Sequence, residues 1–369
     1  MMSHEKYIQK TFQLALKGIP WARPNPLVGA VLVKEGEIIG LGYHQKYGQD
    51  HAEIDCIKNA SQTHDIQGST LYCNLEPCCH HDKQTPPCVQ SIIKAGIKKV
   101  VISNLDPNPK VSGQGIEQLK AAGIEVVSNI LQAEGEKLNE VYFTSIQKNR
   151  PFIIGKWAQS LDGVMATFNK NSKWISCQAS RKMAHQLRRE VQAILVGADT
   201  ALLDNPTLNI RHDQDIDSYV PVRIIMGALE KIPLSHNIFS DQYKKNTLLF
   251  SYDHSQKWQQ QIEDSGIQVV KIGKNFEENI QILLSELRKR KITSLLVEGG
   301  AKTLGQFLKM QLIDKIHIFM APKFLGQGPK VSDHLQLTSV DQSISLDNLT
   351  IEKIGVDFHI SAYPKNGLT

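Results

Sequence analysis

Two short stretches, "HAEIDC" (51–56) and "EPCCHHDKQTPPC" (76–88), decide how the first part of this chain is interpreted. The segment 51–88 holds five of the six cysteines of the 369-residue chain. Disulfides, a bound metal or chance can explain such crowding. The polar N-terminus has no apolar core of signal-peptide length, so we expect a cytoplasmic protein in which thiols stay reduced. Six cysteines are also too few for a disulfide scaffold, which leaves a metal or chance.

The residue types and their order favour a catalytic zinc site. Zinc in such a site takes three protein ligands and keeps one position for water. His51, Cys78 and Cys88 supply these ligands, and Glu53 stands two residues after the histidine to act as general acid and base. The order H-x-E and then P-C is typical of zinc-dependent base deaminases, although their second cysteine follows after two residues rather than nine. A structural zinc site or no metal at all remain the alternatives.

The neighbours of these residues have less defined roles. Cys79 is interpreted as a bystander, because it would point differently from Cys78. His80 and His81 are expected to line the substrate pocket, and the alternatives are additional ligands or solvated side chains.

The charge balance differs between the two parts of the chain. Residues 1–147 carry 14 Lys and Arg against 15 Asp and Glu, and the remaining residues carry 28 against 22. Nucleic-acid affinity depends on cations that neutralise phosphates, so the cysteine-rich part is not expected to bind nucleic acid. The net +6 of the second part favours small phosphorylated ligands. No run approaches the roughly 18 apolar residues of a membrane helix, so no membrane partner is expected.

Predicted strands and helices alternate along both parts, which predicts α/β layers with a largely parallel core. In the first part we expect strands at 27–33, 38–44, 69–77, 98–103 and 124–128, and helices at 5–18, 52–60, 86–96 and 115–123. In the second part we expect strands at 152–160, 193–197, 222–226, 246–251, 267–273, 294–300 and 315–322, with helices at 176–191 and 302–312 between them. A charged helical stretch ends at Pro151, so we divide the chain into domains 1–147 and 148–369.

The stretch "SLLVEGGAKTLG" (294–305) predicts a strand, a Gly-Gly turn and a helix. Backbone N–H groups at such a turn suit a phosphate or pyrophosphate. Close packing alone is the alternative explanation of the two glycines. No G-x-G-x-x-G motif opens a βαβ unit, so a Rossmann site is not supported.

The motifs of both parts resemble one family. "PNPLVGAVLV" (24–33), "GYHQKYGQDHAE" (42–53) and "NLEPCCHHDKQTPPC" (74–88) are similar to the deaminase half of the bifunctional riboflavin-biosynthesis deaminase–reductases. That family has the long cysteine spacing, although "DKQ" here replaces a shorter "GR". "GKWAQSLDGVMA" (155–166) and "QAILVGADTALLDNPTLNIR" (192–211) resemble its reductase half. The resemblance implies a cytidine-deaminase-like α/β/α domain followed by a dihydrofolate-reductase-like α/β domain.

The resemblance also implies cofactors and contact residues. The cofactors are Zn²⁺ and NADPH, and Asn25 is placed to hold the pyrimidine edge. Lys156 is placed to steer the ribose carbonyl or its oxyanion, and it is our second catalytic candidate beside Glu53. Contacts to NADPH are implied for Ala158, Trp174, Thr200, Asp204, Gly300, Ala301, Lys302, Thr303, Leu304 and Gly305. Substrate contacts are implied for Ser172, Arg188, Leu208, Arg211 and Glu298.

These observations predict an enzyme of two successive steps on small phosphoribosyl pyrimidines. Zinc-dependent hydrolysis removes the 2-amino group of 2,5-diamino-6-(5-phosphoribosylamino)pyrimidin-4(3H)-one. NADPH-dependent reduction of the ribosyl group then gives 5-amino-6-(5-phosphoribitylamino)uracil. We also expect a homo-oligomer, a dimer or a tetramer. One alternative is a tRNA or other nucleic-acid base deaminase with an unrelated C-terminal domain, and another is a zinc-stabilised binding module.

Overall fold

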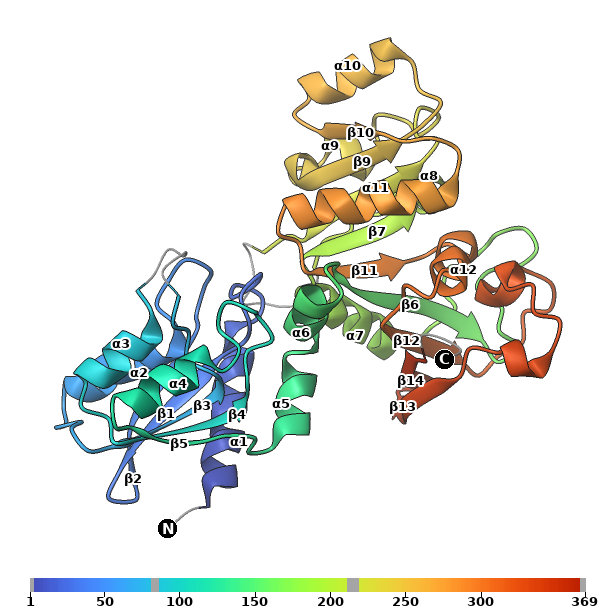
Figure 1. Cartoon of the computed structure of the whole chain (residues 1–369). Coiled ribbons are helices and arrows are strands. Elements are labelled where there is room, and N and C mark those ends of the chain that lie inside the picture. Colours follow the sequence, from blue (N-terminus) through green and yellow to red (C-terminus); the bar gives the residue numbers. More distant parts are fainter. Residues whose placement is uncertain (1–2, 81–85, 211–218, 366–369) are drawn as a thin grey trace. The chain divides into compact units, whose positions relative to one another are not determined.

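The computed structural model of the chain describes residues 3–80, 86–210 and 219–365 (Figure 1). The chain forms two compact units, residues 1–149 and 150–369, and each has its own sheet. None of the helices in the described ranges combines the length and the hydropathy needed to cross a membrane. The predicted α/β class is confirmed in both units.

The first unit contains a sheet with the strand order β2-β1-β3-β4-β5. Its strands are β1 (Gly29–Lys34), β2 (Glu37–Tyr43), β3 (Thr70–Leu75), β4 (Lys99–Asn104) and β5 (Glu125–Val127). β3, β4 and β5 are parallel, but β1 is antiparallel to both β2 and β3. The turn between β1 and β2 has Glu35 at φ 53° and Gly36 at φ 87°, the left-handed pair that closes a tight hairpin. The expected parallel core is therefore limited to one half of this sheet.

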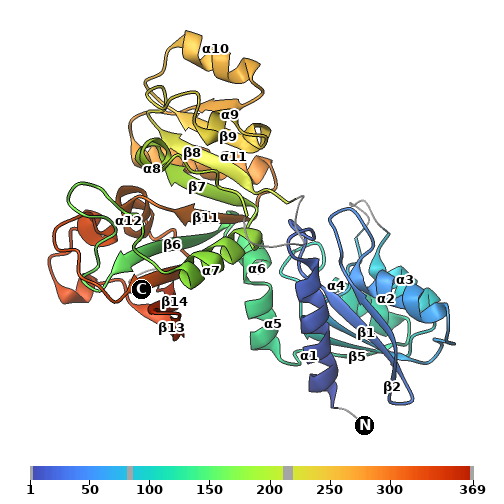
Figure 2. The ribbon, with the colours of Figure 1, turned by 180° about the vertical axis from the view of Figure 1, so that it is seen from behind.

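Helices cover both faces of the first sheet. α1 (His4–Ala15) packs Tyr7 and Ile8 against one face, and Figure 2 shows it in front of the sheet. α2 (Ala52–Ser61), α3 (Cys88–Lys94) and α4 (Gln114–Ala121) bury apolar side chains on the other face. A Cβ at Gly42 would lie only 2.5 Å from the carbonyl oxygen of Ala52, so this glycine allows α2 to pack directly on β2. α5 (Gln132–Leu138) and α6 (Glu140–Gln147) complete the unit.

The second unit contains a sheet whose described strands have the order β10-β9-β8-β7-β11-β6-β12-β14-β13. Its strands are β6 (Phe152–Ser160), β7 (Ala193–Gly197), β8 (Val222–Gly227), β9 (Thr247–Ser251), β10 (Gln268–Lys271), β11 (Ser294–Glu298), β12 (Lys315–Ala321), β13 (Leu346–Ile354) and β14 (Asp357–Pro364). The strands from β10 to β12 are parallel, as expected. The antiparallel hairpin β13–β14 was not predicted.

The core of the second unit lies between its sheet and two helices. α11 (Phe276–Lys289) and α12 (Ala301–Lys309) pack on one face over Ile153 and Val297. α7 (Gln178–Arg189) covers the opposite face, as the views of Figures 1 and 2 show. The shorter helices α8 (Ala198–Asp204), α9 (Asn237–Ser240) and α10 (Gln256–Asp264) follow β7, β8 and β9 along the chain.

Candidate active sites

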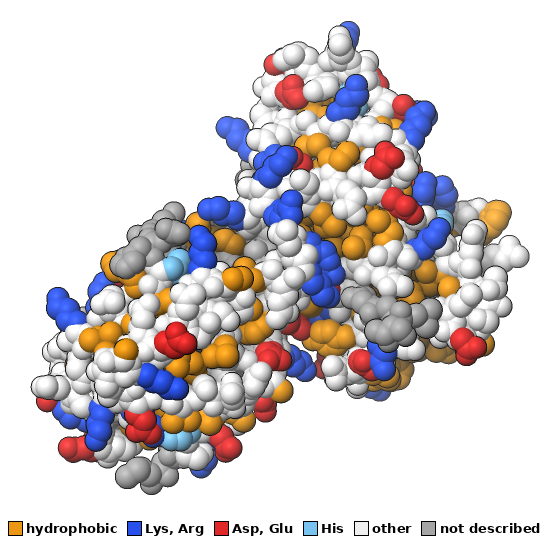
Figure 3. Space-filling model, viewed as in Figure 1, with side chains coloured by type: hydrophobic (Ala, Val, Ile, Leu, Met, Phe, Trp, Pro, Cys, Tyr) orange, Lys and Arg blue, Asp and Glu red, His pale blue; other side chains and the backbone are white. Residues whose placement is uncertain are grey.

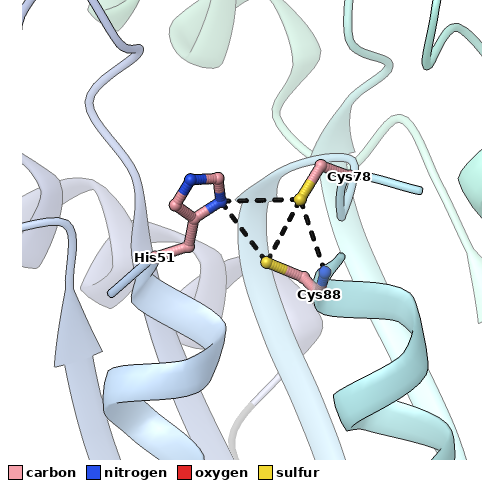
Figure 4. A group of neighbouring side chains, drawn as sticks. All are labelled: His51, Cys78 and Cys88. Carbon is pink, nitrogen blue, oxygen red and sulfur yellow. Dashed lines mark hydrogen bonds between the residues drawn. The ribbon is translucent and has the colours of Figure 1, made fainter. Parts of the chain in front are cut away.

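The three predicted zinc ligands meet in the first unit (Figure 4). His51 is the N-cap of α2, Cys78 follows β3, and Cys88 is the first residue of α3. The two sulfur atoms are 3.3 Å apart, and Nδ1 of His51 lies 3.5 Å from Sγ of Cys78 and 3.4 Å from Sγ of Cys88. The backbone N–H of Cys88 donates to Sγ of Cys78 over 3.4 Å, which favours a thiolate at that atom.

This triangle fits a zinc ion. Tetrahedral zinc with Zn–S of about 2.3 Å and Zn–N of about 2.05 Å separates two sulfurs by about 3.8 Å and sulfur from nitrogen by about 3.5 Å. The observed separations of 3.3, 3.4 and 3.5 Å lie within about 0.5 Å of these values. Three ligands from one histidine and two cysteines leave a fourth position for water, as in catalytic zinc sites.

Glu53 and Asn25 lie on segments next to this triangle. Glu53 is in the first turn of α2, two residues after His51, and only 3% of its side chain surface is exposed. Nδ2 of Asn25 lies 3.0 Å from Nε2 of His44, and the ring of His44 meets that of His51 edge-on at 5.3 Å. Nδ1 of His44 lies 2.9 Å from the carbonyl oxygen of Asp50. The sequence analysis did not single out His44, although it lies inside the quoted stretch "GYHQKYGQDHAE".

Glu76 holds the segment that carries Cys78. Its buried carboxylate accepts hydrogen bonds from the backbone N–H groups of Asp106, Gly113, Gly115 and Ile116, at 3.0 to 3.2 Å. Because these donors belong to the loop after β4 and to the start of α4, the "EPC" motif joins β3 to the rest of the unit. A hydrogen-bonded carboxylate beside the ligand fixes the position of Cys78.

The other residues of the cysteine-rich segment separate from the triangle. Sγ of Cys79 donates to the carbonyl oxygen of Lys110 at 3.8 Å, away from the three ligands. His80 is half-buried. His81 and the insertion at 82–84 lie outside the described residues, so their predicted roles have no structural counterpart here.

In the second unit, three charged residues meet on one face of the sheet. Arg188 of α7 donates from Nε and NH2 to the two carboxylate oxygens of Glu298, at 2.9 and 2.7 Å. Nζ of Lys156 lies 3.6 Å from Glu298, its register partner on the adjacent strand. NH1 of Arg188 also donates to the carbonyl oxygen of Asn209 at 2.8 Å. Arg188 is therefore held by protein acceptors on two sides.

Burial and charge oppose each other in this cluster. Burial alone would raise the pKa of Glu298, but the charges of Arg188 and Lys156 outweigh it and lower this pKa to about 2. Burial lowers the pKa of Lys156, and the nearby carboxylate only partly offsets that effect. Lys156 is thus an ammonium that gives up a proton more readily than a solvated lysine does, which suits a proton donor.

The predicted cofactor site lies where β7 and β11, two adjacent parallel strands, end. Oγ1 of Thr200 accepts a hydrogen bond from the N–H of Gly300 at 3.1 Å. A Cβ at Gly299 would lie 2.8 Å from Cγ2 of Thr200, and one at Gly197 would lie 2.7 Å from Oγ1 of Thr303. These glycines keep the backbone close to Thr200 of α8 and Thr303 of α12, and two hydroxyls beside the start of α12 are an arrangement that suits a phosphate group.

The remaining predicted residues fall into three groups. Ala158 on β6, Ala301 at the start of α12 and the exposed Lys302 surround this edge of the sheet. Ser172 and Trp174 lie in the segment before α7, where the exposed indole of Trp174 stacks under Arg181 at 4.4 Å. Asp204 ends α8, and Leu208 is buried with φ 51°.

Two of the predicted cofactor residues, Leu304 and Gly305, also take part in the packing of α12. Leu304 is fully buried in the core, and a Cβ at Gly305 would lie 2.5 Å from the carbonyl oxygen of Val331. The side chain of Leu304 therefore faces the protein interior, and the predicted cofactor contact of both residues stays a prediction. Arg211 lies outside the described residues.

Comparison with known proteins links both sites to one family. The family model described as "RibD C-terminal domain" matches residues 151–360, and "Cytidine and deoxycytidylate deaminase zinc-binding region" matches residues 1–104. The "Riboflavin biosynthesis protein RibD" of Aquifex aeolicus is 42% identical over 96% of this chain and 97% of its own length. The chain belongs to the RibD family.

Solved RibD structures agree with this assignment. The structure of RibD from Acinetobacter baumannii (form 1) matches with a TM-score of 0.88 and 32% identity, over 98% of this chain and 99% of that one. A diaminohydroxyphosphoribosylaminopyrimidine deaminase/5-amino-6-(5-phosphoribosylamino)uracil reductase from Thermotoga maritima matches with a TM-score of 0.85 and 34% identity, over the same shares. The Escherichia coli RibD protein is 34% identical over 89% of this chain and 90% of its own length.

As a RibD family member, the chain is a bifunctional deaminase and reductase of riboflavin biosynthesis. The predicted fold classes, the two activities and the cofactors zinc and NADPH are confirmed by the family assignment. The alternative of a nucleic-acid deaminase with an unrelated second domain is wrong, because residues 151–360 match the RibD reductase domain.

On the face shown in Figure 3, basic and acidic side chains are interspersed over the first unit.

Proposed function

We propose that residues 1–149 deaminate 2,5-diamino-6-(5-phosphoribosylamino)pyrimidin-4(3H)-one and that residues 150–369 reduce its product. The triangle of His51, Cys78 and Cys88 beside a buried glutamate supports the first step most directly. The cluster of Lys156, Glu298 and Arg188 supports the second.

In the first step, His51, Cys78 and Cys88 hold the metal. Bound there, zinc acts as a Lewis acid and makes a water molecule nucleophilic near neutral pH. Glu53 takes the proton of the attacking water, passes it to a ring nitrogen and then protonates the departing amine. Asn25, held by His44, binds the edge of the pyrimidine.

In the second step, Thr200 and the first turn of α12 bind the cofactor phosphates. NADPH supplies the hydride that reduces the ribosyl group to a ribityl chain. Lys156 contacts the sugar and donates a proton, and Glu298 keeps Lys156 and Arg188 in place. The product is 5-amino-6-(5-phosphoribitylamino)uracil.

We further propose a homo-oligomer built through the hairpin β13–β14. β13 is the last strand of the sheet, and the face that carries Ile351 and Phe358 leaves these side chains 61% and 38% exposed. Val356 in the turn of the hairpin is 62% exposed. Apolar side chains on an unpaired edge strand favour aggregation unless another chain covers them. A monomer at micromolar concentration in sedimentation velocity would contradict this proposal.

We propose a cytoplasmic location, where thiols stay reduced. None of the six cysteines, all within the described residues, takes part in a disulfide.

The zinc ligands are tested by Cys88→Ser. We expect zinc to bind at least about 100-fold more weakly, because even changes behind a ligand cost 10- to 100-fold. The measurement is the zinc content after dialysis against a chelator. Cys79→Ser is the matched control, since Cys79 is a buried neighbour whose thiol donates to a backbone carbonyl instead. Full zinc occupancy in Cys88→Ser would contradict the assignment of Cys88 as a zinc ligand.

The division of labour is tested with a fragment of residues 150–369 and the already deaminated intermediate. We expect it to oxidise NADPH without zinc, because no predicted metal ligand lies in this unit. One charged hydrogen bond to the 2′-phosphate contributes roughly 1.5–3 kcal/mol. This energy corresponds to about a tenfold to hundredfold preference over NADH at 1.36 kcal/mol per decade. A folded fragment that is inactive, or that uses NADH equally well, would contradict the proposal.

A further inference from the structure

Three residues of the last strands form a continuous hydrogen-bonded row. Nδ1 of His317 on β12 lies 2.9 Å from Nε2 of His359 on β14, and Nδ1 of His359 lies 2.7 Å from Oε1 of Glu352 on β13. The planes of the two imidazole rings are inclined by 5°, and the ring of Phe319 stacks on that of His359 with 4.9 Å between the ring centroids. Both histidines are buried, whereas the side chain of Glu352 is 58% exposed. The row therefore connects the interior of the sheet with solvent.

The carboxylate at the outer end fixes the tautomer of both rings. An ionised Glu352 only accepts hydrogen bonds, so Nδ1 of His359 carries the proton and its Nε2 is an acceptor. Nδ1 of His317 then donates to that Nε2, which leaves Nε2 of His317 with a lone pair. A carboxylate that orients a histidine in this way also stabilises the charge that develops when the ring takes up a proton.

The inner end of the row lies beside the proposed reductase site. His317 is the register partner of Lys156 on β6, and Lys156 is the register partner of Glu298 on β11. Register partners on adjacent strands point to the same face, about 4.8 Å apart at the backbone. A sugar that contacts Lys156 therefore lies within reach of His317.

Burial and the charged groups around His317 disfavour an imidazolium in which the extra proton stays on His317. Burial lowers the pKa of His317 to about 3, with further contributions from Lys315 on its own strand and from His359. Lys156 faces it from β6, and Arg188 of α7 lies beyond Glu298. Uptake of a proton at Nε2 is therefore favourable only when the Nδ1 proton moves on to His359 and the proton of His359 moves on to Glu352. The charge is then neutralised at the solvent-exposed carboxylate.

A group that takes up a proton and returns it can serve the reduction of a ribosylamine at two points. When the sugar ring opens, the C1′–O4′ bond breaks and its electron pair goes to O4′, which takes a proton from Lys156. The nitrogen lone pair forms the C1′=N double bond, and loss of the proton on that nitrogen gives a neutral imine rather than an iminium cation. When the hydride from NADPH reaches C1′, the π electrons return to nitrogen, which takes up a proton again. NADPH is oxidised to NADP⁺, and the net proton consumed is the one from Lys156, which solvent replaces.

We propose that His317, acting through His359 and Glu352, takes the proton released from the substrate nitrogen at ring opening and returns it at hydride transfer. This inference rests on the reduction proposed above, with Lys156 at the sugar.

The test measures reduction of the deaminated substrate by the full-length protein loaded with zinc. We expect His317→Gln to lower kcat about 100-fold, at the lower end for general acid–base groups, with the KM for NADPH unchanged. Glu352→Gln, a change at an exposed strand position that leaves the fold intact, lowers kcat at least about tenfold, again with the KM for NADPH unchanged. Asp347→Asn is the control, since Asp347 is a carboxylate of the same strand that pairs with Lys365 instead.

The outcomes distinguish a failure of the proposed reductase function from a failure of the proposed role of His317. If the wild-type protein does not oxidise NADPH with this substrate, the proposed function itself fails. If it does, wild-type kcat in His317→Gln overturns the inference. So does wild-type kcat in Glu352→Gln, or a rise in the KM for NADPH that accompanies the loss of kcat, because a purely structural histidine pair would disturb binding as well as turnover.

Discussion

Replacing Glu53 by glutamine is expected to lower the rate of deamination by at least about 10⁴-fold, while the zinc content and the fold stay as in the wild type. Glutamine has the same shape, so the buried position at the start of α2 remains filled. It has no ionisable proton. The measurement is ammonia release from the diamino substrate together with zinc analysis of the same preparation.

The size of this effect follows from the number of proton transfers. One general acid or base contributes typically about 10²- to 10⁴-fold. Glu53 serves water activation, ring protonation and departure of the amine, so its loss reaches or exceeds the upper end of that range. His51 begins the same helix, and the helix therefore positions the metal ligand and the proton carrier together.

The matched control is Asp55→Asn in the same turn of α2. Asp55 accepts a hydrogen bond from the N–H of Tyr43 at 3.0 Å and takes no part in the proposed chemistry. We expect near wild-type deamination in this variant. Reduction of the deaminated intermediate by Glu53→Gln provides a second control, because the reductase residues lie in the other unit. Ammonia release by Glu53→Gln near the wild-type rate would show that another group carries the protons.

The zinc triangle was predictable from the sequence because its chemistry restricts the residue types. Few side chains bind zinc, and the spacing of His51, Cys78 and Cys88 brought them to the start of two helices and the end of a strand. His44 was missed, because a single histidine carries no ligand pattern. Its role depends on the contacts with Asn25 and His51, which only the folded chain shows.

The hairpin β13–β14 was missed for a physical reason. Nearly all side chains of β13 are exposed or half-buried, so the strand lacks the alternation of apolar and polar residues that marks a half-buried strand. Its existence depends on pairing with β14, which in turn pairs with β12. The row of His317, His359 and Glu352 crosses these three strands, so it could not be predicted from the sequence for the same reason.

The Arg188–Glu298 pair shows a further limit of sequence patterns. The motifs predict a substrate contact for each residue, which stays a prediction, but they do not reveal that the two side chains bind each other across 110 positions of the chain. A motif names the residues near a site without stating which of them contact the ligand. Similarly, the "GGAKTLG" motif does not reveal that Leu304 and Gly305 pack α12 against the rest of the unit.

Glu298→Gln is expected to lower the free energy of unfolding of the second unit by about 3–5 kcal/mol, because it leaves two buried cations without their counter-ion. The side chains of Lys156 and Arg188 are only 16% and 11% exposed, so water cannot replace the carboxylate. We also expect the reductase activity to be lost, since Lys156 is no longer held at the site. Urea unfolding at pH 7 measures the change in stability.

The control for this variant is Glu286→Gln on α11. Glu286 pairs with Lys289 and Arg290 at the surface, where such pairs contribute about 0.2–1 kcal/mol. Adding Arg188→Met to Glu298→Gln removes one of the two buried cations that lack a counter-ion, and we expect this second change to restore part of the lost stability.

The pH dependence gives an independent check on Glu298. Its pKa in the folded state is lowered to about 2, below the ordinary value of 4.5, so the folded state favours the ionised form. The stabilisation is therefore complete above about pH 4.5 and is lost as the pH falls toward 2. The difference in unfolding free energy between the wild type and Glu298→Gln should stay constant from pH 7 to pH 5 and narrow below that. A difference that persists unchanged down to pH 2 would mean that the variant loses packing rather than charge, and the buried ion pair would not be what holds Lys156.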